Sequence, residues 1–590
     1  MTATTQPAAA AVGGWHALVI GLVAVLAVGG GIAAGSFLLN GRDAGTGEAA
    51  GYIPADAPFY LEWRLDPSAE QDAALRDLLG AFPPIEGLDL ARPLYEQLGE
   101  VIDEQLATQD EIDLTWSADV EPWFDGSLAM AVTEIDVEAL AVPTDPMAEP
   151  PMPGMLVVAG VTDADAARAF VDKLVAEAEG TGQTFTATEH AGVTIRAAGE
   201  EGAFAVTDSA ILAAPDAAAI QAAIDLAGNG EGNLAGTPDM QAMVDALPSD
   251  WIGFATYDFT EIMAASLTEA SSADPTMGAA MRELLDHQPM RGAAAFTAGG
   301  DRFAMDAVTP QPTGPFTMEN ADRSLASEVP GDVLFYSESG NIGAALSAIL
   351  ATVKDAAASE PGAAEQIGMA EAALGADLEE LVAWIDDGAI VAGWDGTAAY
   401  GGLLLVPNDV EAAERRLSQL ATFAGLAGFD PSSGISVTER DVSGTTVTSI
   451  EWADPNAGDV EEFGMPLGVT AGFTVELAVT EDRAIIGLGD AFVEKILAGA
   501  ADGSLADEAR YADAIADLGG TPNAGVSWMD LRSLRETLES TLGSMLGSVD
   551  ADGAYGADIQ PWLLPLDRAV SVTVVADDLV VQRSALLIGE

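Results

Sequence analysis

The stretch Tyr52–Pro67, YIPADAPFYLEWRLDP, decides the fold of this chain, because a similar stretch returns much later as Val329–Tyr336, VPGDVLFY. In both stretches a Pro and an Asp favour a turn, and an aromatic run rich in β-forming residues follows. Each stretch opens a long segment that mixes predicted strands with helices. The echo therefore predicts two related domains that arose by internal duplication.

The order of elements behind the two openings supports this interpretation. Trp123 and Trp384 each precede a Gly and a predicted strand, and a second strand and a helix follow. Aligning Asp163 with Asp409 superposes the two helices without a gap. Their apolar residues then coincide at a spacing that makes one buried face in each helix: Ala164, Ala167, Val171 and Leu174 against Val410, Ala413, Leu417 and Leu420.

Local signals agree with these helices. Thr162 with Asp165, and Asn408 with Glu411, have the residue types of an N-cap and its N3 partner. The matching positions of Trp123 and Trp384 favour a shared packing role near the start of a strand. A ligand cleft lined by these indoles is the alternative.

The sequence thus predicts an α+β protein: an N-terminal transmembrane helix followed by two related, mainly antiparallel sheet-plus-helix domains. Consecutive strands joined by tight turns favour this class over a doubly wound parallel sheet. The predicted boundaries are a disordered segment at 1–16, a transmembrane helix at 17–39, a tether at 40–51, a first domain at 52–310, a linker at 311–328 and a second domain at 329–590.

The transmembrane prediction rests on Ala17–Leu39, ALVIGLVAVLAVGGGIAAGSFLL, which has no ionisable residue. As a helix this run is long enough to cross a hydrocarbon core of about 30 Å. A cleaved signal peptide is the alternative, although no Lys or Arg precedes the run. The expectation is a single-pass protein that contacts the bilayer through 17–39, with the bulk of the chain outside the cytoplasm.

The composition excludes several function classes. With 94 acidic against 22 basic residues the formal net charge is −72, so binding to nucleic acid or another polyanion is not expected. The acidity has two interpretations, a solvated shell suited to high salt and collective binding of cations. The chain has no cysteine, which excludes disulfides, thiolate metal sites and cysteine nucleophiles.

The opening stretch, the apolar run before it and the echo at Val329–Tyr336 together resemble a family of bacterial, membrane-anchored proteins catalogued only as a domain of unknown function. The resemblance implies a single N-terminal span with most of the chain outside the cytoplasm. It implies no catalytic residues, because none is defined for the family.

A search for chemistry finds no catalytic motif, and no cofactor is predicted. The histidines His16, His190 and His287 are far apart, and surface or capping roles are expected for them. Asp550, Asp552 and Asp558 alternate with Gly and resemble a calcium loop, but the spacing does not match an EF-hand. They are the candidate metal ligands, and the acids of the second domain's insertion have the same standing: Asp454, Asp459, Glu461 and Glu462.

The predicted function is a non-enzymatic binding or envelope-associated role, with an envelope protein or a small apolar or cationic ligand as partner. Two alternatives remain open. One is an envelope hydrolase that uses carboxylates, which would need buried acids with raised pKa values. The other is a structural or assembly role in which the insertions at Val142–Gly154 and Trp452–Phe473 contact partners.

Overall fold

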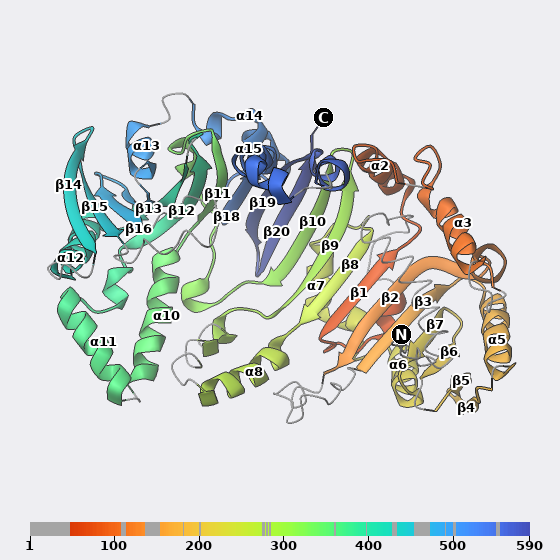
Figure 1. The fold of residues 1–590 in the computed structure, drawn as a ribbon. Helices are drawn as coiled ribbons and strands as arrows, with labels where there is room; N and C mark the ends of the chain where they lie inside the picture. Colours follow the sequence, from red (N-terminus) through yellow and green to blue (C-terminus); the bar gives the residue numbers. More distant parts are fainter. Residues whose placement is uncertain are drawn as a thin grey trace, which may run out of the picture. The chain divides into compact units, whose positions relative to one another are not determined.

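The computed structural model describes residues 48–589 except 86, 108–113, 136–153, 181, 200–201, 274–277, 279–280, 283–284, 359–360, 397, 428–433, 454–471, 490, 500–502 and 550–554. The chain divides into two compact units. Unit 1 comprises Met1–Phe259 and Arg291–Asp301, and unit 2 comprises Thr260–Met290 and Arg302–Glu590. Each unit is an antiparallel sheet packed with helices (Figure 1).

The elements of unit 1 alternate short runs of strands with helices. In chain order they are η1 (Glu48–Tyr52), β1 (Phe59–Arg64), α2 (Ala69–Leu79), α3 (Leu94–Ala107), η2 (Trp116–Val120), β2 (Phe124–Glu134), β3 (Gly154–Val161), α5 (Ala164–Gly180), β4 (Thr186–His190), β5 (Val193–Ala197), β6 (Ala203–Val206), β7 (Ala210–Ala214), α6 (Ala217–Asn229), η3 (Leu234–Gly236), α7 (Pro238–Asp245), β8 (Gly253–Asp258) and β9 (Arg291–Gly299).

Unit 2 contains a similar series. In chain order it comprises α8 (Thr260–Ala273), β10 (Arg302–Pro310), η4 (Gly314–Phe316), η5 (Leu325–Ser327), β11 (Val333–Ser339), α10 (Ile342–Ala357), α11 (Pro361–Leu374), η6 (Glu379–Leu381), β12 (Ile385–Trp394), β13 (Ala399–Pro407), α12 (Val410–Ala427), β14 (Ile435–Val442), β15 (Thr445–Ala453), β16 (Gly472–Val479), β17 (Ala484–Leu488), α13 (Phe492–Ala498), η8 (Leu505–Asp507), α14 (Ala509–Asp517), β18 (Gly525–Asp530), α15 (Leu531–Val549), η9 (Tyr555–Ile559), α16 (Gln560–Leu563), β19 (Leu566–Ala576) and β20 (Leu579–Ile588).

The strand order is the same in the two units. Antiparallel pairing in unit 1 gives the order β9-β8-β1-β2-β3-β7-β6-β5-β4. Pairing in unit 2 gives β10-β20-β19-β18-β11-β12-β13-β17-β16-β15-β14. Adding ten to each strand number of unit 1 reproduces the order from β19 to β14, so both units follow one folding pattern.

The two opening stretches are held in the same way. The carbonyl of Ile53 accepts a hydrogen bond from the Leu234 N–H at 2.8 Å, and the carbonyl of Val329 accepts one from Leu505 at 2.9 Å. The next residue in each stretch, a proline, forms an isolated antiparallel bridge, to Asn233 in unit 1 and to Ser504 in unit 2. The two stretches with Pro and Asp are therefore fixed by matching backbone contacts, and each leads into a strand, β1 or β11, that is paired on both sides.

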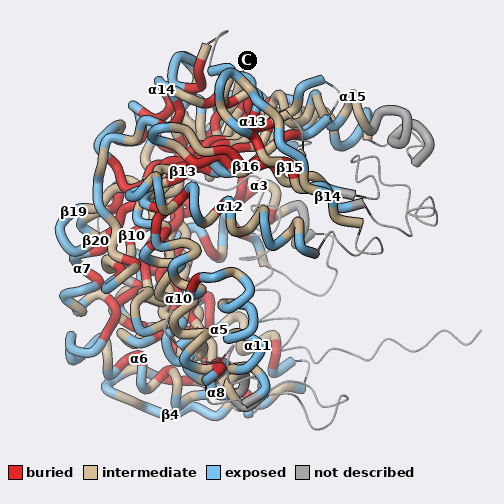
Figure 2. Tube along the Cα trace, turned by 90° about the vertical axis from the view of Figure 1, so that its left-hand side faces the viewer, coloured by how far each residue is buried: buried red, intermediate tan, exposed pale blue. Residues whose placement is uncertain are grey.

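Apolar residues on these central strands form the cores. Tyr60 in β1 and Tyr336 in β11 are fully buried, and Trp123 and Trp384 are also buried. Figure 2 shows buried positions gathered along the strands and exposed positions on helices and turns. The aromatic residues bury the most area per side chain, so they contribute most of the hydrophobic stabilisation of these cores.

The N-caps of helices α5 and α12 are Asp163 and Asp409, one residue later than predicted. Asp163 Oδ1 accepts hydrogen bonds from the N–H groups of Asp165 and Ala166, and Asp409 Oδ1 accepts one from Ala412. The N–H groups of Thr162 and Asn408 instead donate to the carbonyls of Trp123 and Trp384, at 2.7 and 2.8 Å. The predicted caps Thr162 and Asn408 were wrong by one residue, because their side chains donate to the carbonyls of Trp123 and Ala383 instead of accepting from the first N–H groups of the helix.

The predicted fold class needs a correction. The mainly antiparallel sheets with packed helices are confirmed, but the transmembrane helix is not: residues 17–39 lie outside the described residues. Within the described part of the chain, the search for a helix with the length and hydropathy to cross a bilayer finds none. Helix α12, for example, packs Ala413 and Leu417 of one apolar face on a sheet. The described residues thus form an antiparallel sheet protein with packed helices, and the transmembrane part of the predicted class is not shown.

Candidate ligand pocket

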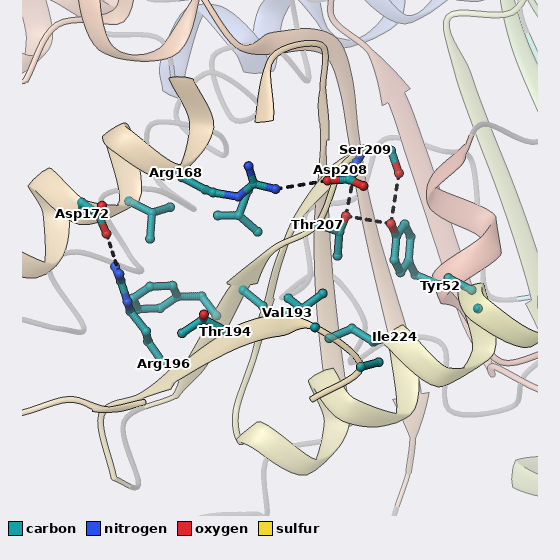
Figure 3. A pocket seen from close by; sticks show the side chains of 18 residues that line it. Tyr52, Arg168, Asp172, Val193, Thr194, Arg196, Thr207, Asp208, Ser209 and Ile224 are labelled. Atoms are coloured by element: carbon teal, nitrogen blue, oxygen red, sulfur yellow. Dashed lines mark hydrogen bonds and ion pairs between the residues drawn. The ribbon is translucent and has the colours of Figure 1, made fainter. Parts of the chain in front are cut away.

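A pocket of about 540 Å³ lies at one end of the sheet of unit 1 (Figure 3). Two tight turns meet there, the β4–β5 turn and the β6–β7 turn, and α5 and α6 contribute side chains. Ala191 in the first turn and Gly192 beside it both have positive φ, which suits a two-residue hairpin. The volume falls within the range of about 300–1,000 Å³ that is usual for small-molecule sites.

Arg168 reaches the pocket from α5. It donates to Asp165, one turn back on the same helix, at 2.9 Å and to Asp208 in the β6–β7 turn at 3.1 Å. The carboxylates of Asp165 and Asp208 are 95% and 98% exposed, and the Arg168 side chain is 46% exposed. Ion pairs with such exposed partners contribute about 0–1 kcal/mol, so these contacts hold the guanidinium only weakly.

Arg196 enters the pocket from β5, and its guanidinium is more enclosed than that of Arg168. One terminal nitrogen donates to Asp172 of α5, whose carboxylate is 62% exposed while the arginine is 27% exposed. Phe204 of β6 and Val171 of α5 also line the pocket. The guanidinium of Arg196 therefore combines a charged edge with apolar neighbours.

Hydroxyl groups form the opposite wall. The Tyr52 hydroxyl lies 2.8 Å from Thr207 Oγ1 and 3.0 Å from Ser209 Oγ, within hydrogen-bond distance of both (Figure 3). Thr207 Oγ1 also accepts from the N–H of Ala210 at 2.9 Å, which fixes the β6–β7 turn. The wall is thus held in place by a network of hydrogen bonds, and it presents donors and acceptors to the pocket.

The equivalent place in unit 2 is built differently. The β16–β17 turn, Thr480–Arg483, is closed by the same Thr480 N–H to Arg483 carbonyl bond that Thr207 makes with Ala210. Tyr52 precedes Ile53 as Glu328 precedes Val329, so Glu328 occupies the position of Tyr52. Its carboxylate accepts bonds from Nε and Nη2 of Arg483, at 3.1 and 2.6 Å. An internal ion pair therefore occupies the position of the Tyr52 hydroxyl wall.

A second group of polar residues is buried in the central strands. Tyr60 donates to Glu62 at 2.6 Å, and Tyr336 donates to Glu338 in the same way. Burial raises the pKa of Glu338 above its ordinary value, an effect that the hydrogen bond from Tyr336 only partly offsets. Burial also lowers the pKa of Arg64, whose guanidinium lies 3.6 Å from the ring centre of Trp251. None of these side chains lines the pocket of unit 1.

Most of the predicted metal ligands lie outside the described residues. Asp550 and Asp552 lie outside the described residues, whereas Asp558 lies in η9. The acids of the insertion, Asp454, Asp459, Glu461 and Glu462, also lie outside them. Among the described residues no group of three or more His, Asp or Glu side chains is arranged to hold a metal ion.

Two of the histidines are accounted for. His190 Nε2 lies 2.8 Å from an Asp225 oxygen, and His287 Nδ1 lies 3.0 Å from the Thr313 hydroxyl. His16 lies outside the described residues. His190 thus pairs with an exposed aspartate, and His287 also packs its ring against Phe316.

The packing role predicted for the two tryptophans is confirmed. The indole N–H of Trp123 donates to the carbonyl of Asp119, and that of Trp384 donates to the carbonyl of Leu381, both at 2.7 Å. Trp123 packs with Phe124 and Phe170 in the core of unit 1. Both rings thus anchor a short helix to the sheet beside it.

Sequence reasoning missed the residues that line the pocket, above all Tyr52, Arg168 and Arg196. One signal was available: basic residues are scarce in this chain, 22 among 590, so each arginine on a strand or helix is notable. The pattern did not show that β5, α5 and the stretch before β1 converge, because that depends on long-range pairing.

Comparisons with known proteins give a family but no activity. The model of a family described as "Protein of unknown function (DUF3352)" matches residues 18–552. No curated protein matches. A solved structure titled "Structure of crystal form I of TP0453" matches with a TM-score of 0.21 and 7% identity, covering 44% of this chain and 77% of that chain. A likeness of this extent supports no conclusion about function.

The predicted resemblance to a family of unknown function is confirmed by this match, whereas the membrane anchoring that the resemblance implied is not supported. The match extends over more than half of the chain. The chain therefore belongs to the DUF3352 family of proteins of unknown function.

Proposed function

We propose that this protein binds a small organic ligand in the pocket of unit 1 and does not convert it chemically. The observation that carries the proposal is the convergence of two arginines, a hydroxyl wall and apolar side chains in a cavity of about 540 Å³. Small-molecule sites combine an apolar lining with a few well-placed polar groups. This pocket has that composition, and ordered strands and helices hold its walls.

The carboxylate hydrolase that the sequence left open has less support. General acid catalysis at neutral pH calls for a carboxyl group with a raised pKa that reaches a substrate. Glu338 has a raised pKa, but it is buried and bonded to Tyr336 in a central strand. The acids that line the pocket are Asp172 and Asp208, and both carboxylates are largely exposed and paired with arginine.

The proposal is tested by closing the pocket with one side chain. Ala227 lies on an exposed part of α6 and lines the pocket, so Ala227→Trp should fill it without disturbing the core. Ala222→Trp is the matched control, since Ala222 is also exposed on α6 and does not line the pocket. Thermal unfolding of the full chain is measured with a library of small acids, amines, sugars and neutral aromatic compounds.

A ligand that binds only the native state stabilises it by mass action and so raises the melting temperature. At a ligand concentration of 100 times Kd the free energy of unfolding rises by about 2.7 kcal/mol. We expect at least one class of compound to stabilise the wild type and Ala222→Trp but not Ala227→Trp. Absence of stabilisation by any compound, or equal stabilisation of Ala227→Trp, would contradict the proposal.

A further inference from the structure

The charges around the pocket differ from those of the chain as a whole. The chain has a formal net charge of −72 and 22 basic residues in 590. The pocket lining contains two guanidinium groups, Arg168 and Arg196, and two carboxylates, Asp172 and Asp208. The lining is therefore locally neutral, and its cations stand out from a strongly acidic surface.

Both guanidinium groups have hydrogen-bonding capacity to spare. A guanidinium has five N–H donors. In the described part of the chain, Arg196 uses one of its terminal nitrogens, toward Asp172, and Arg168 uses two, toward Asp165 and Asp208. Because all three carboxylates are more than half exposed, a ligand can replace them at small cost.

Unit 2 has an ion pair at the place that the Tyr52 hydroxyl wall occupies in unit 1. There the carboxylate of Glu328 meets the guanidinium of Arg483 in a two-pronged pair. The positions of Arg168 and Arg196 are occupied in unit 2 by Glu414 and Thr448, as the helix caps and the turns at Gly192 and Gly444 align them. Unit 2 thus has an arginine paired with a glutamate at this place, whereas the carboxylates that line the pocket of unit 1, Asp172 and Asp208, are more than half exposed.

The geometry points to an organic oxyanion as the ligand, with its carboxylate or phosphate group on the guanidinium of Arg196, the more enclosed of the two, and Arg168 as the second cation of the same lining. Guanidinium forks match the two oxygens of such a group and bind them by charge-assisted hydrogen bonds. The apolar body of the ligand would lie against Val171, Phe204 and Ile224, which also line the pocket. This inference rests on the proposed function and adds the chemical class of the ligand.

The experiment compares three probes that share one ring: benzoate, phenyl phosphate and benzylamine. Binding of each to the full chain is measured by calorimetry, with Arg168→Gln and Arg196→Gln as test variants. Arg92→Gln is the matched control, because Arg92 is a partly exposed arginine paired with Glu100 and does not line the pocket. Melting temperatures of the variants show that each one is folded.

We expect benzoate or phenyl phosphate to bind more tightly than benzylamine. Arg196→Gln should weaken that binding about tenfold or more and Arg168→Gln somewhat less, since Arg196 is the more enclosed of the two. Arg92→Gln should have no effect. The tighter of the two anions identifies the group as carboxylate or phosphate.

The oxyanion assignment and the proposed binding function can fail separately. If benzylamine binds best and Ala227→Trp abolishes its binding, the pocket is a binding site but the oxyanion assignment is wrong. An anion affinity that neither arginine variant changes would also overturn the assignment. If none of the three probes binds while a neutral compound of the library still stabilises the wild type and not Ala227→Trp, the oxyanion assignment is overturned and the binding function stands.

Discussion

At one end of its sheet unit 1 has a hydroxyl wall beside a pocket, and at the equivalent place unit 2 has an ion pair. In unit 1 the Tyr52 hydroxyl bonds to Thr207 and Ser209 beside a pocket with two arginines. In unit 2 a Glu328–Arg483 pair takes the position of that hydroxyl wall. The backbone of the turn is the same in both, so a few side chains change what this end of the sheet can bind.

The comparison separates conserved packing from variable chemistry within one chain. The buried tryptophans, the central tyrosines and the helix caps recur in both units, because each sheet needs the same core to fold. The side chains at the turn are partly exposed, so replacing them has a small effect on stability. A duplicated fold can therefore keep the same core in both copies while the side chains at one end of the sheet differ.

The largest expected effect tests the shared core. Trp123→Ala and Trp384→Ala each remove a buried ring and leave a cavity, so each should destabilise its unit by roughly 3–5 kcal/mol. Trp452→Ala is the control, because Trp452 is 49% exposed and its loss should change stability little. Denaturant unfolding of the full chain measures all three. A loss below about 1 kcal/mol for either buried tryptophan would show that the two positions do not share this role.

A smaller effect tests the ion pair between Glu328 and Arg483 in unit 2. Arg483 and Glu328 are 18% and 33% exposed, between the extremes of a buried and a surface pair. Arg483→Ala should therefore cost about 1 kcal/mol, with a coupling energy of similar size in a double-mutant cycle with Glu328→Gln. Tyr52→Phe in unit 1 is the parallel variant, and loss of its hydroxyl should cost about 0.5–1.5 kcal/mol. A coupling energy near zero would show that Glu328 and Arg483 do not stabilise each other.

The smallest expected effect concerns pH. Burial raises the pKa of Glu338 above the ordinary value of 4.5. Above pH 4.5 the unfolded chain loses this proton before the folded chain does, so the contribution of Glu338 to stability falls as pH rises through the raised pKa. Glu338→Gln keeps an acceptor for Tyr336 and avoids the buried charge. Its melting temperature should exceed that of the wild type by more at pH 8 than at pH 5.

Asp530 in the same unit gives the opposite sign and serves as the control. Burial raises the pKa of Asp530, but hydrogen bonds from Arg510 and Ser533 outweigh burial and lower it overall. Its stabilisation is therefore present at neutral pH and is lost as pH falls through the lowered pKa. Asp530→Asn should destabilise the protein at pH 8, and the difference should shrink toward acid pH. Equal pH dependence in both variants would contradict these assignments.

Much of the fold could be predicted from the pattern of residues. The two strands and the helix predicted after Trp123 and after Trp384 are present as β2, β3 and α5 in unit 1 and as β12, β13 and α12 in unit 2. The aligned apolar faces of α5 and α12 also pack as expected, with Ala167 and Ala413 fully buried. These features depend on periodicity and turn residues, which are local properties of the chain.

The pocket could not be predicted in this way. Tyr52, Arg168 and Arg196 are distant in sequence, and no local pattern in their own segments shows that they line one pocket. Asp550 and Asp552 drew attention because alternating acids are visible in a short window, yet the sequence offers many acids and few ways to rank them.

The sequence by itself determined the antiparallel α+β class, the order of the elements and the two tryptophans that anchor the cores, because hydrophobic period and turn chemistry act within a few residues. Only the tertiary structure decided which turns meet, which arginines line one cavity and which glutamates are buried. Those outcomes depend on strand pairings between distant segments, and on burial that removes solvent from a side chain only after the sheet has formed.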